Sequence, residues 1–174
     1  MTAVRLRFLG HGPEHDEHTA ERRLSLATLY REVTLGLSTA ELWAHVTRIG
    51  GTCGMIANPV ECTSDGDTRT CTTADGTRFV ENILGTDETH QRIGYSGYMM
   101  GGSALPTEFH AASMQVIDAG DGRATLRWIT DIKPDEALES MQAIVDIGVA
   151  ALEARHPLAT HSEPLPASTG ARSD

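Results

Sequence analysis

The sequence has no cluster of basic residues, and its 14 lysines and arginines are outnumbered by 24 aspartates and glutamates, so the formal charge is −10. Nucleic-acid backbones are bound through such clusters, so the composition argues against a nucleic-acid partner. The chain also lacks an apolar run of the roughly 20 residues that a membrane span needs, and its N-terminus lacks the apolar run of a signal peptide. We therefore expect a cytoplasmic protein without a membrane partner.

Cysteines and aromatic residues are scarce. Three cysteines, Cys53, Cys62 and Cys71, are an odd number in a chain without a secretion signal, and none of them forms a CxxC pair. This pattern favours free thiols over a disulfide framework, although Cys62 and Cys71 would face each other if they lay on paired strands. Aromatic residues make up 5% of the chain. Few large side chains are thus available to fill the interior of a curved sheet.

Both ends of the chain read as flexible. Residues 1–23 contain the polar stretch GHGPEHDEH, and residues 157–174 are rich in proline, serine, threonine and alanine. The spacing of His11, His15 and His18 would suit metal ligands, but clustered histidines on a flexible polar segment are more often solvated, so we predict no metal site. Residues 24–156 are long enough for one domain with its own core.

A long helix is predicted over residues 136–156, directly after a strand at 124–133. One face of the helix is apolar, and Pro134 and Asp135 suit its first turn. A helix of about 30 Å crosses a whole small domain and usually covers the concave face of a sheet. The residues predicted to form the apolar stripe are Leu138, Met141, Val145, Gly148 and Leu152.

The segment before residue 60 predicts a strand and a helix. Residues 29–34 alternate between apolar and polar, as a strand with one buried face does. Ser38 lies three residues before Glu41, the spacing of a capping box, and opens a helix that Gly50 and Gly51 end. Residues 52–59 fit a loop or a short second helix, and the sequence does not decide between them.

From residue 60 onward the sequence has the rhythm of hairpins. The turn sequences SDGD, ADG and TDETH separate strand-like runs at a spacing of about ten residues, which predicts an antiparallel meander. An α+β fold follows, with a curved antiparallel sheet around the final helix and room for a ligand inside. The predicted strands are residues 68–73, 77–84, 91–100, 107–117 and 124–133.

Several short motifs occur in a characteristic order. They are STAELWAHVTRIGG in the early helix, GDTR at 66–69, VEN at 80–82, IGYS at 93–96, the proline in ALP at 104–106, and RWITDIKP at 127–134. Their order and spacing resemble the helix-grip START/Bet v1-like (SRPBCC) superfamily, and the last motif resembles its polyketide cyclase/dehydratase-like branch. The resemblance implies a helix-grip fold with an internal cavity and no cofactor. The tryptophan–proline pair that many members carry after the first helix is absent, and GGTCG stands there instead.

The resemblance implies that Arg69 and Glu81 face a ligand from neighbouring strands, whereas the residues alone also allow both to be solvent-facing. A buried Arg69 would hold a carboxylate or an enolate-like oxygen. Burial would raise the pKa of Glu81 and suit proton transfer, whereas pairing with Arg69 would lower it and suit binding. Tyr95 would donate to a carbonyl oxygen, or else simply pack in the core. We predict Arg69, Glu81 and Tyr95 as the catalytic residues.

Adjacent strand residues face opposite ways, so only one of Phe109 and His110 can point inward. Exposing a phenylalanine costs apolar burial, and we therefore predict Phe109 inside and His110 on the surface. Trp128 lies on the more apolar face of its strand, where it either contacts a ligand or only packs. The predicted ligand-binding residues are Phe109, Trp128, Tyr98, Met141 and Val145.

Three functions remain open. The first is a polyketide cyclase/aromatase-like enzyme that acts on a hydrophobic poly-carbonyl or aromatic molecule by positioning and acid–base catalysis. The second is a non-catalytic carrier or sensor of a hydrophobic small molecule, and the third is a protein-interaction module. The sequence leaves a homodimer open. A cavity with several inward polar groups would favour the enzyme, and a purely apolar one the carrier.

Overall fold

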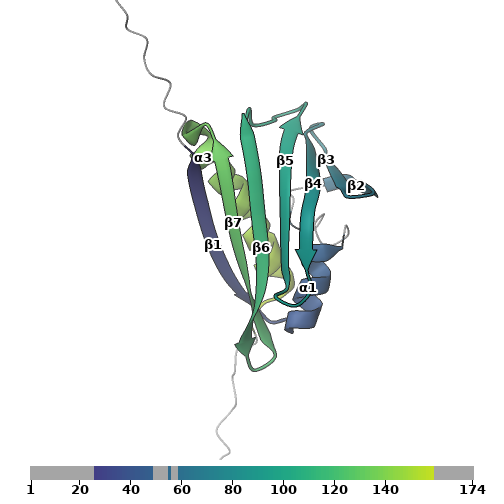
Figure 1. The fold of residues 1–174 in the computed structure, drawn as a ribbon, viewed down its shortest axis with the longest axis vertical. Coiled ribbons are helices and arrows are strands. Elements are labelled where there is room, and N and C mark those ends of the chain that lie inside the picture. Colours follow the sequence, from purple (N-terminus) through teal and green to yellow (C-terminus); the bar gives the residue numbers. More distant parts are fainter. Residues whose placement is uncertain (1–25, 49–54, 56–58, 159–174) are drawn as a thin grey trace, which may run out of the picture.

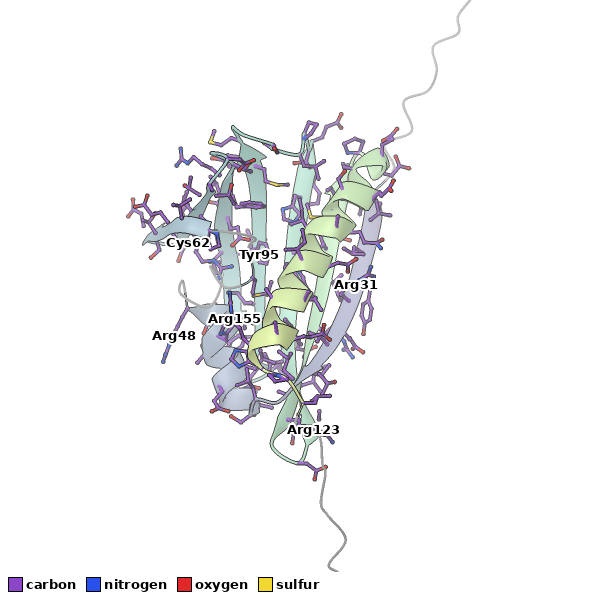
Figure 2. The ribbon with its side chains drawn as sticks, turned by 180° about the vertical axis from the view of Figure 1, so that it is seen from behind. Arg31, Arg48, Cys62, Tyr95, Arg123 and Arg155 are labelled. Carbon is purple, nitrogen blue, oxygen red and sulfur yellow. A yellow bond between two sulfur atoms is a disulfide. The ribbon has the colours of Figure 1, made fainter. Side chains whose placement is uncertain are left out.

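Seven antiparallel strands form one curved sheet, and a long helix lies across one of its faces (Figures 1 and 2). The computed structural model describes residues 26–48, 55 and 59–158. This architecture confirms the predicted α+β class. The strands, in chain order, are β1 (Ala27–Leu35), β2 (Pro59–Asp65), β3 (Thr68–Thr73), β4 (Arg78–Asp87), β5 (Arg92–Met100), β6 (Phe109–Gly120) and β7 (Arg123–Lys133), and the helices are α1 (Thr39–Thr47), the single 3₁₀ turn η1 (Asp135–Ala137) and α3 (Leu138–Arg155).

The sheet order is β1-β7-β6-β5-β4-β3-β2, so only the pairing of β1 with β7 joins strands distant in sequence. Five strands lie where the hairpin rhythm predicts them, and β2 is an addition. Most residues of β2 are exposed, because it is an edge strand beyond the cover of α3. A strand exposed on both faces has no reason to alternate in polarity, which explains why the sequence pattern missed it.

The predicted capping box at the start of α1 is present. The Ser38 backbone N–H donates to the Glu41 carboxylate at 2.8 Å, and the Glu41 N–H donates to the Ser38 hydroxyl oxygen at 3.3 Å. The helix ends at Thr47. Trp43 on α1 donates its indole N–H to Glu88 at 2.6 Å, which ties the helix to the turn between β4 and β5.

Helix α3 begins two residues later than predicted, because the 3₁₀ turn η1 precedes it. Of the predicted stripe, Met141, Val145, Gly148 and Leu152 are buried, and Leu138 is partly buried. A Cβ on Gly148 would lie 2.7 Å from the Met55 carbonyl oxygen and 3.2 Å from the Trp128 ring. Glycine at this position therefore lets α3 approach the sheet closely.

The core fills the space between α3, α1 and the concave face of the sheet. The alternating burial along β7 matches the prediction for that strand. At the edge of the core, Arg31 on β1 forms an ion pair with Asp146 on α3, with 2.7 Å between Nε and Oδ1 (Figure 2). None of the helices in the described ranges is long and apolar enough to cross a bilayer. The inward residues of β7 are Ala124, Leu126, Trp128, Thr130 and Ile132.

The free-thiol prediction is wrong for two of the cysteines. Cys62 and Cys71 are directly opposite each other on β2 and β3, with 4.1 Å between their Cα atoms, and form a disulfide. The hairpin turn between the two strands sets this register. The expectation of free thiols rested on the absence of a secretion signal and gave the strand register too little weight. Cys53 lies outside the described residues, as do the histidines of residues 1–23, Gly50 and Gly51, and the chain after residue 158.

Candidate functional site

An internal cavity lies between α3 and the inner face of strands β4 to β7. Its unfilled space is about 50 Å³, which is room for a few water molecules. Apolar side chains make most of the wall, with a small number of polar groups among them. The aromatic and methionine residues of the wall are Phe79, Tyr98, Trp128, Met55, Met99, Met114 and Met141, and the polar ones are Glu81, Tyr95, His110 and Thr130.

Arg69 and Glu81 are direct neighbours across β3 and β4, and both point inward. The Arg69 Nη2 atom lies 2.9 Å from Glu81 Oε2, and Nη1 donates to the Val46 carbonyl oxygen at 3.2 Å. Arg69 is only 5% exposed. The surface alternative for these two residues is therefore wrong, and the structure holds a buried ion pair at the edge of the cavity.

The electrostatics of Glu81 combine two opposing effects. Burial raises the pKa of its carboxyl group, and the charge and hydrogen bond of Arg69 oppose that rise. Burial is the larger effect, so the carboxyl binds a proton more readily than an exposed glutamate does. Such a group suits proton transfer near neutral pH.

Tyr95 lies beside the ion pair and is 2% exposed. The Arg69 guanidinium carbon is 5.6 Å from the centre of the Tyr95 ring, and the Trp128 indole N–H donates to the Tyr95 hydroxyl oxygen at 3.1 Å. Burial, together with the negative charge of Glu81, raises the pKa of Tyr95. The hydroxyl group thus keeps its proton and is suited to donate a hydrogen bond to an oxygen of a bound molecule.

The predicted orientation of Phe109 and His110 is wrong. Phe109 is 45% exposed and does not line the cavity, whereas His110 does. The ring centres of His110 and Tyr95 are 6.0 Å apart in an edge-to-face arrangement. Burial lowers the pKa of His110, and a hydrogen bond with the Gly97 backbone opposes this. Met114 and Val116, further along β6, are apolar and lie an even number of residues from His110. They therefore indicated in the sequence that His110 faces inward.

The remaining predicted ligand-binding residues divide between the cavity and its rim. Trp128, Met141 and Val145 line the interior. Tyr98 borders the cavity but is 48% exposed, because the β5–β6 ladder stops at the Ser96–Ala111 pair and Tyr98 lies beyond it. The structure thus places all three predicted catalytic residues and four of the five predicted ligand-binding residues at or beside one cavity.

A second hollow, of about 470 Å³, lies on the opposite side of the sheet. Small residues such as Gly85, Gly94 and Ser113 form it, and two of its charged residues, Asp87 and Arg92, are exposed. Within residues 26–48, 55 and 59–158, no group of three or more histidine, cysteine, aspartate or glutamate side chains is placed to hold a metal ion. The buried polar groups therefore make the inner cavity the candidate site.

No protein-family model and no curated protein sequence matches the chain. Solved structures do match it. An uncharacterised protein from Bacillus thuringiensis aligns with a TM-score of 0.64 and 16% identity, over 74% of this chain and 98% of that one. The protein Ara h 8.0201 aligns with a TM-score of 0.58 and 17% identity, over 75% and 97%.

A third match is norcoclaurine synthase from Thalictrum flavum in complex with dopamine and hydroxybenzaldehyde. Its TM-score is 0.53 at 16% identity, over 90% of this chain and 100% of that one. Identities this low show a similarity of fold only. Together with the sheet order and the terminal helix, they show that this chain has the helix-grip fold of Bet v1-like proteins.

Proposed function

We propose that this chain is an enzyme that cyclises or dehydrates a flat poly-carbonyl or aromatic molecule inside the cavity, in the manner of a polyketide cyclase or aromatase. The observation that carries the proposal is the buried ion pair of Arg69 and Glu81 beside the Tyr95 hydroxyl group. Burying two charges costs free energy of folding, and a cavity that only held an apolar ligand would be more stable without them. A polar cluster in an otherwise apolar cavity is what acid–base chemistry on an organic molecule requires.

Each polar group has a role that its contacts support. Arg69 keeps the Glu81 carboxylate in place and supplies positive charge near the ring of Tyr95. Tyr95 donates a hydrogen bond to a carbonyl oxygen of the substrate, and Glu81 transfers protons. Catalysis then comes from positioning and from electrostatic stabilisation of negative charge on oxygen. Trp128, Met141 and Val145 supply the apolar wall, and Tyr98 lies at the rim.

Binding of a ring system requires the wall to move, since the unfilled space is about 50 Å³. Four lining residues are methionines, whose unbranched side chains adopt other rotamers at little cost. The fold tolerates such ligands elsewhere: the norcoclaurine synthase structure of the same fold holds dopamine and hydroxybenzaldehyde, both small aromatic molecules. The cavity is therefore an adaptable one that opens around its ligand.

The test is a binding screen with aromatic polyketides and their shunt products, read by thermal shift and by tryptophan fluorescence, since Trp128 lines the cavity. A ligand that binds is then assayed for turnover with Glu81→Gln and Arg69→Ala. Glu81→Gln should keep affinity and lower turnover by about 10²–10⁴, whereas Arg69→Ala should weaken both. Binding without turnover, unchanged in both variants, would establish a carrier instead.

A further inference from the structure

We propose that His110 and Glu81 are an acid–base pair that acts from two sides on a substrate seated over Gly97, and that this substrate is an enolisable carbonyl compound. His110 is the group that removes the proton from carbon. The inference rests on the proposed function and names the chemistry of the same cavity. Four features of the structure support it: a shared row across the sheet, a position without a side chain in that row, the hydrogen bond of the histidine, and a donor for the substrate oxygen.

Glu81 and His110 lie in one row of inward-facing residues. Arg69 on β3 is opposite Glu81 on β4, and Glu81 is opposite Gly97 on β5. The last paired residues of β5 and β6 are Ser96 and Ala111, so His110 occupies the next position beside Gly97. Strands β4 and β6 are two inter-strand spacings apart, which is about 10 Å. That backbone separation allows a flat molecule to lie between a carboxyl group and an imidazole ring once the cavity wall has moved.

Gly97, which has no side chain, lies between them in this row. A Cβ there would lie 2.8 Å from the Val80 carbonyl oxygen and 3.4 Å from the Glu81 Cγ atom. Any side chain would therefore push against backbone and occupy the space between Glu81 and His110. The glycine itself borders the cavity, so a bound molecule reaches both groups across it.

The hydrogen bond of His110 fixes which of its nitrogens is basic. Its hydrogen bond with the Gly97 backbone favours the protonated ring, as expected when a ring N–H donates to the carbonyl oxygen. Neutral imidazole has one donor and one acceptor nitrogen, so the other nitrogen carries the lone pair. Burial lowers the pKa of His110, which keeps that lone pair available at neutral pH. The charged groups facing the same space are Glu81 and, behind it, Arg69.

The chemical step is balanced within the site. The free His110 nitrogen takes a proton from the carbon next to a carbonyl group, the C–H electron pair becomes a C=C bond, and the carbonyl π pair moves to oxygen. Tyr95 donates a hydrogen bond to the resulting enolate. The enolate carbon then attacks a second carbonyl carbon of the same molecule, and the new alkoxide takes the proton from His110. The product is an isomer, so no oxidant or further reactant is needed. If the isomer then loses water, protonated Glu81 gives its proton to the departing hydroxyl group, His110 takes a proton from the neighbouring carbon, and the C–H electron pair becomes a new C=C bond.

The experiment separates binding from proton removal with two bicyclic probes. 2-Tetralone is a flat ketone with exchangeable protons next to its carbonyl group, and 2-naphthol has the same size with a permanent enol-like oxygen. Exchange of the 2-tetralone protons in D₂O is followed by NMR, and 2-naphthol binding by titration calorimetry. His110→Gln should slow enzyme-dependent exchange by about 10²-fold or more and change 2-naphthol affinity by less than about threefold. Added imidazole should restore exchange in His110→Ala.

Two further variants complete the design. Gly97→Ala should lose both exchange and binding, because the new methyl group fills the space between the two groups. His90→Gln is the matched control, because His90 is an exposed histidine on the β4–β5 turn, and it should match the wild type. Exchange that survives in His110→Gln, or that imidazole fails to restore in His110→Ala, would overturn the role of His110. Wild-type binding of 2-naphthol without exchange of 2-tetralone would overturn the reaction but leave a binding cavity. Absence of 2-naphthol binding would overturn the proposed function as well.

Discussion

The indole N–H of Trp128 on β7 donates to the hydroxyl oxygen of Tyr95 on β5, 3.1 Å away, across the intervening strand β6. Two buried polar groups thereby satisfy each other inside an apolar wall. The bond also fixes the direction in which the Tyr95 hydroxyl group faces the cavity. Because a buried polar group that loses its partner is costly, the fold should be sensitive to single changes at this pair.

Trp128→Phe and Tyr95→Phe should each destabilise the fold by about 1–3 kcal/mol, because each leaves one polar group of the pair buried without its partner. The double variant should lose less than the sum of the two, by about 1 kcal/mol, since it removes both groups. Chemical denaturation of the wild type, the two single variants and the double variant measures the coupling free energy between the two side chains. Strict additivity would mean that the two groups do not bond in solution.

Arg69→Met should destabilise the fold by about 3–5 kcal/mol at neutral pH, because it leaves the Glu81 carboxylate buried without its charge partner. Arg92→Met, at an exposed position on β5, is the matched control and should cost about 0.5 kcal/mol or less. The pKa of Glu81 is raised in the folded protein, so the folded state favours the protonated carboxyl group.

The loss in Arg69→Met should therefore be smallest at about pH 4, below the ordinary pKa of glutamate, and should grow as the pH rises through the raised pKa of Glu81. Urea unfolding of both variants at several pH values measures this dependence. A penalty that is independent of pH would show that Glu81 is not the group left uncompensated.

Two partly buried histidines should make the protein sensitive to acid. Burial lowers the pKa of His110 and of His45, and the nearby charges of His156 and Arg155 lower that of His45 further. The unfolded chain then binds protons more readily than the folded one, so stability should fall as the pH drops below about 6.5. His45→Gln and His110→Gln should each flatten the stability profile as the pH falls below about 6.5. Thermal unfolding of the wild type and the variants across this pH range tests the expectation.

The packing of α3 against the sheet should depend on the buried apolar residues of the helix. Leu152 is fully buried, and Leu152→Ala should cost about 2–5 kcal/mol, whereas the exposed Glu139→Ala should cost about 0.5 kcal/mol or less. Equilibrium denaturation compares the two. Equal losses would mean that the helix presents a different face to the sheet in solution.

The disulfide between β2 and β3 closes a short loop, since its two cysteines are nine positions apart in sequence. Closing a loop of that length in the unfolded chain should contribute about 2–3 kcal/mol to stability. Cys62→Ala, or a reducing agent on the wild type, should remove that contribution, and the reducing agent should have no further effect on Cys62→Ala. Free thiols in the untreated protein, counted by alkylation and mass spectrometry at Cys62 and Cys71, would contradict the pairing.

Periodicity predicted those parts of the fold in which one face is buried. The stripe of α3 and the alternation of β7 depend on local spacing, and both were readable from the sequence. Strand β2 was not, because an exposed edge imposes no pattern. The orientation of His110 was missed because the cost of exposing Phe109 was weighed alone, while the parity of the strand is set by all of its inward residues together.

The row formed by Arg69, Glu81, Gly97 and His110 could not be predicted in the same way. It depends on the register of three neighbouring strand pairs, and the pairing of β4 with β5 shifts at a bulge between Ile83 and Gly85. Register across strands is a long-range property that turn sequences only partly determine. The resemblance to known helix-grip proteins supplied Arg69 and Glu81, and the three-dimensional arrangement shows that His110 lies in the same row.

The methionine wall also makes the cavity vulnerable to oxidants. Met99, Met114 and Met141 surround the same space, and oxidation of a thioether to a sulfoxide places a polar, bulkier group where an apolar one stood. The proposed opening of the cavity around a ligand would also admit peroxide when no ligand is bound. Occupancy would then shield the sulfur atoms, so that the pattern of methionine oxidation along the chain would show whether the protein carried its ligand.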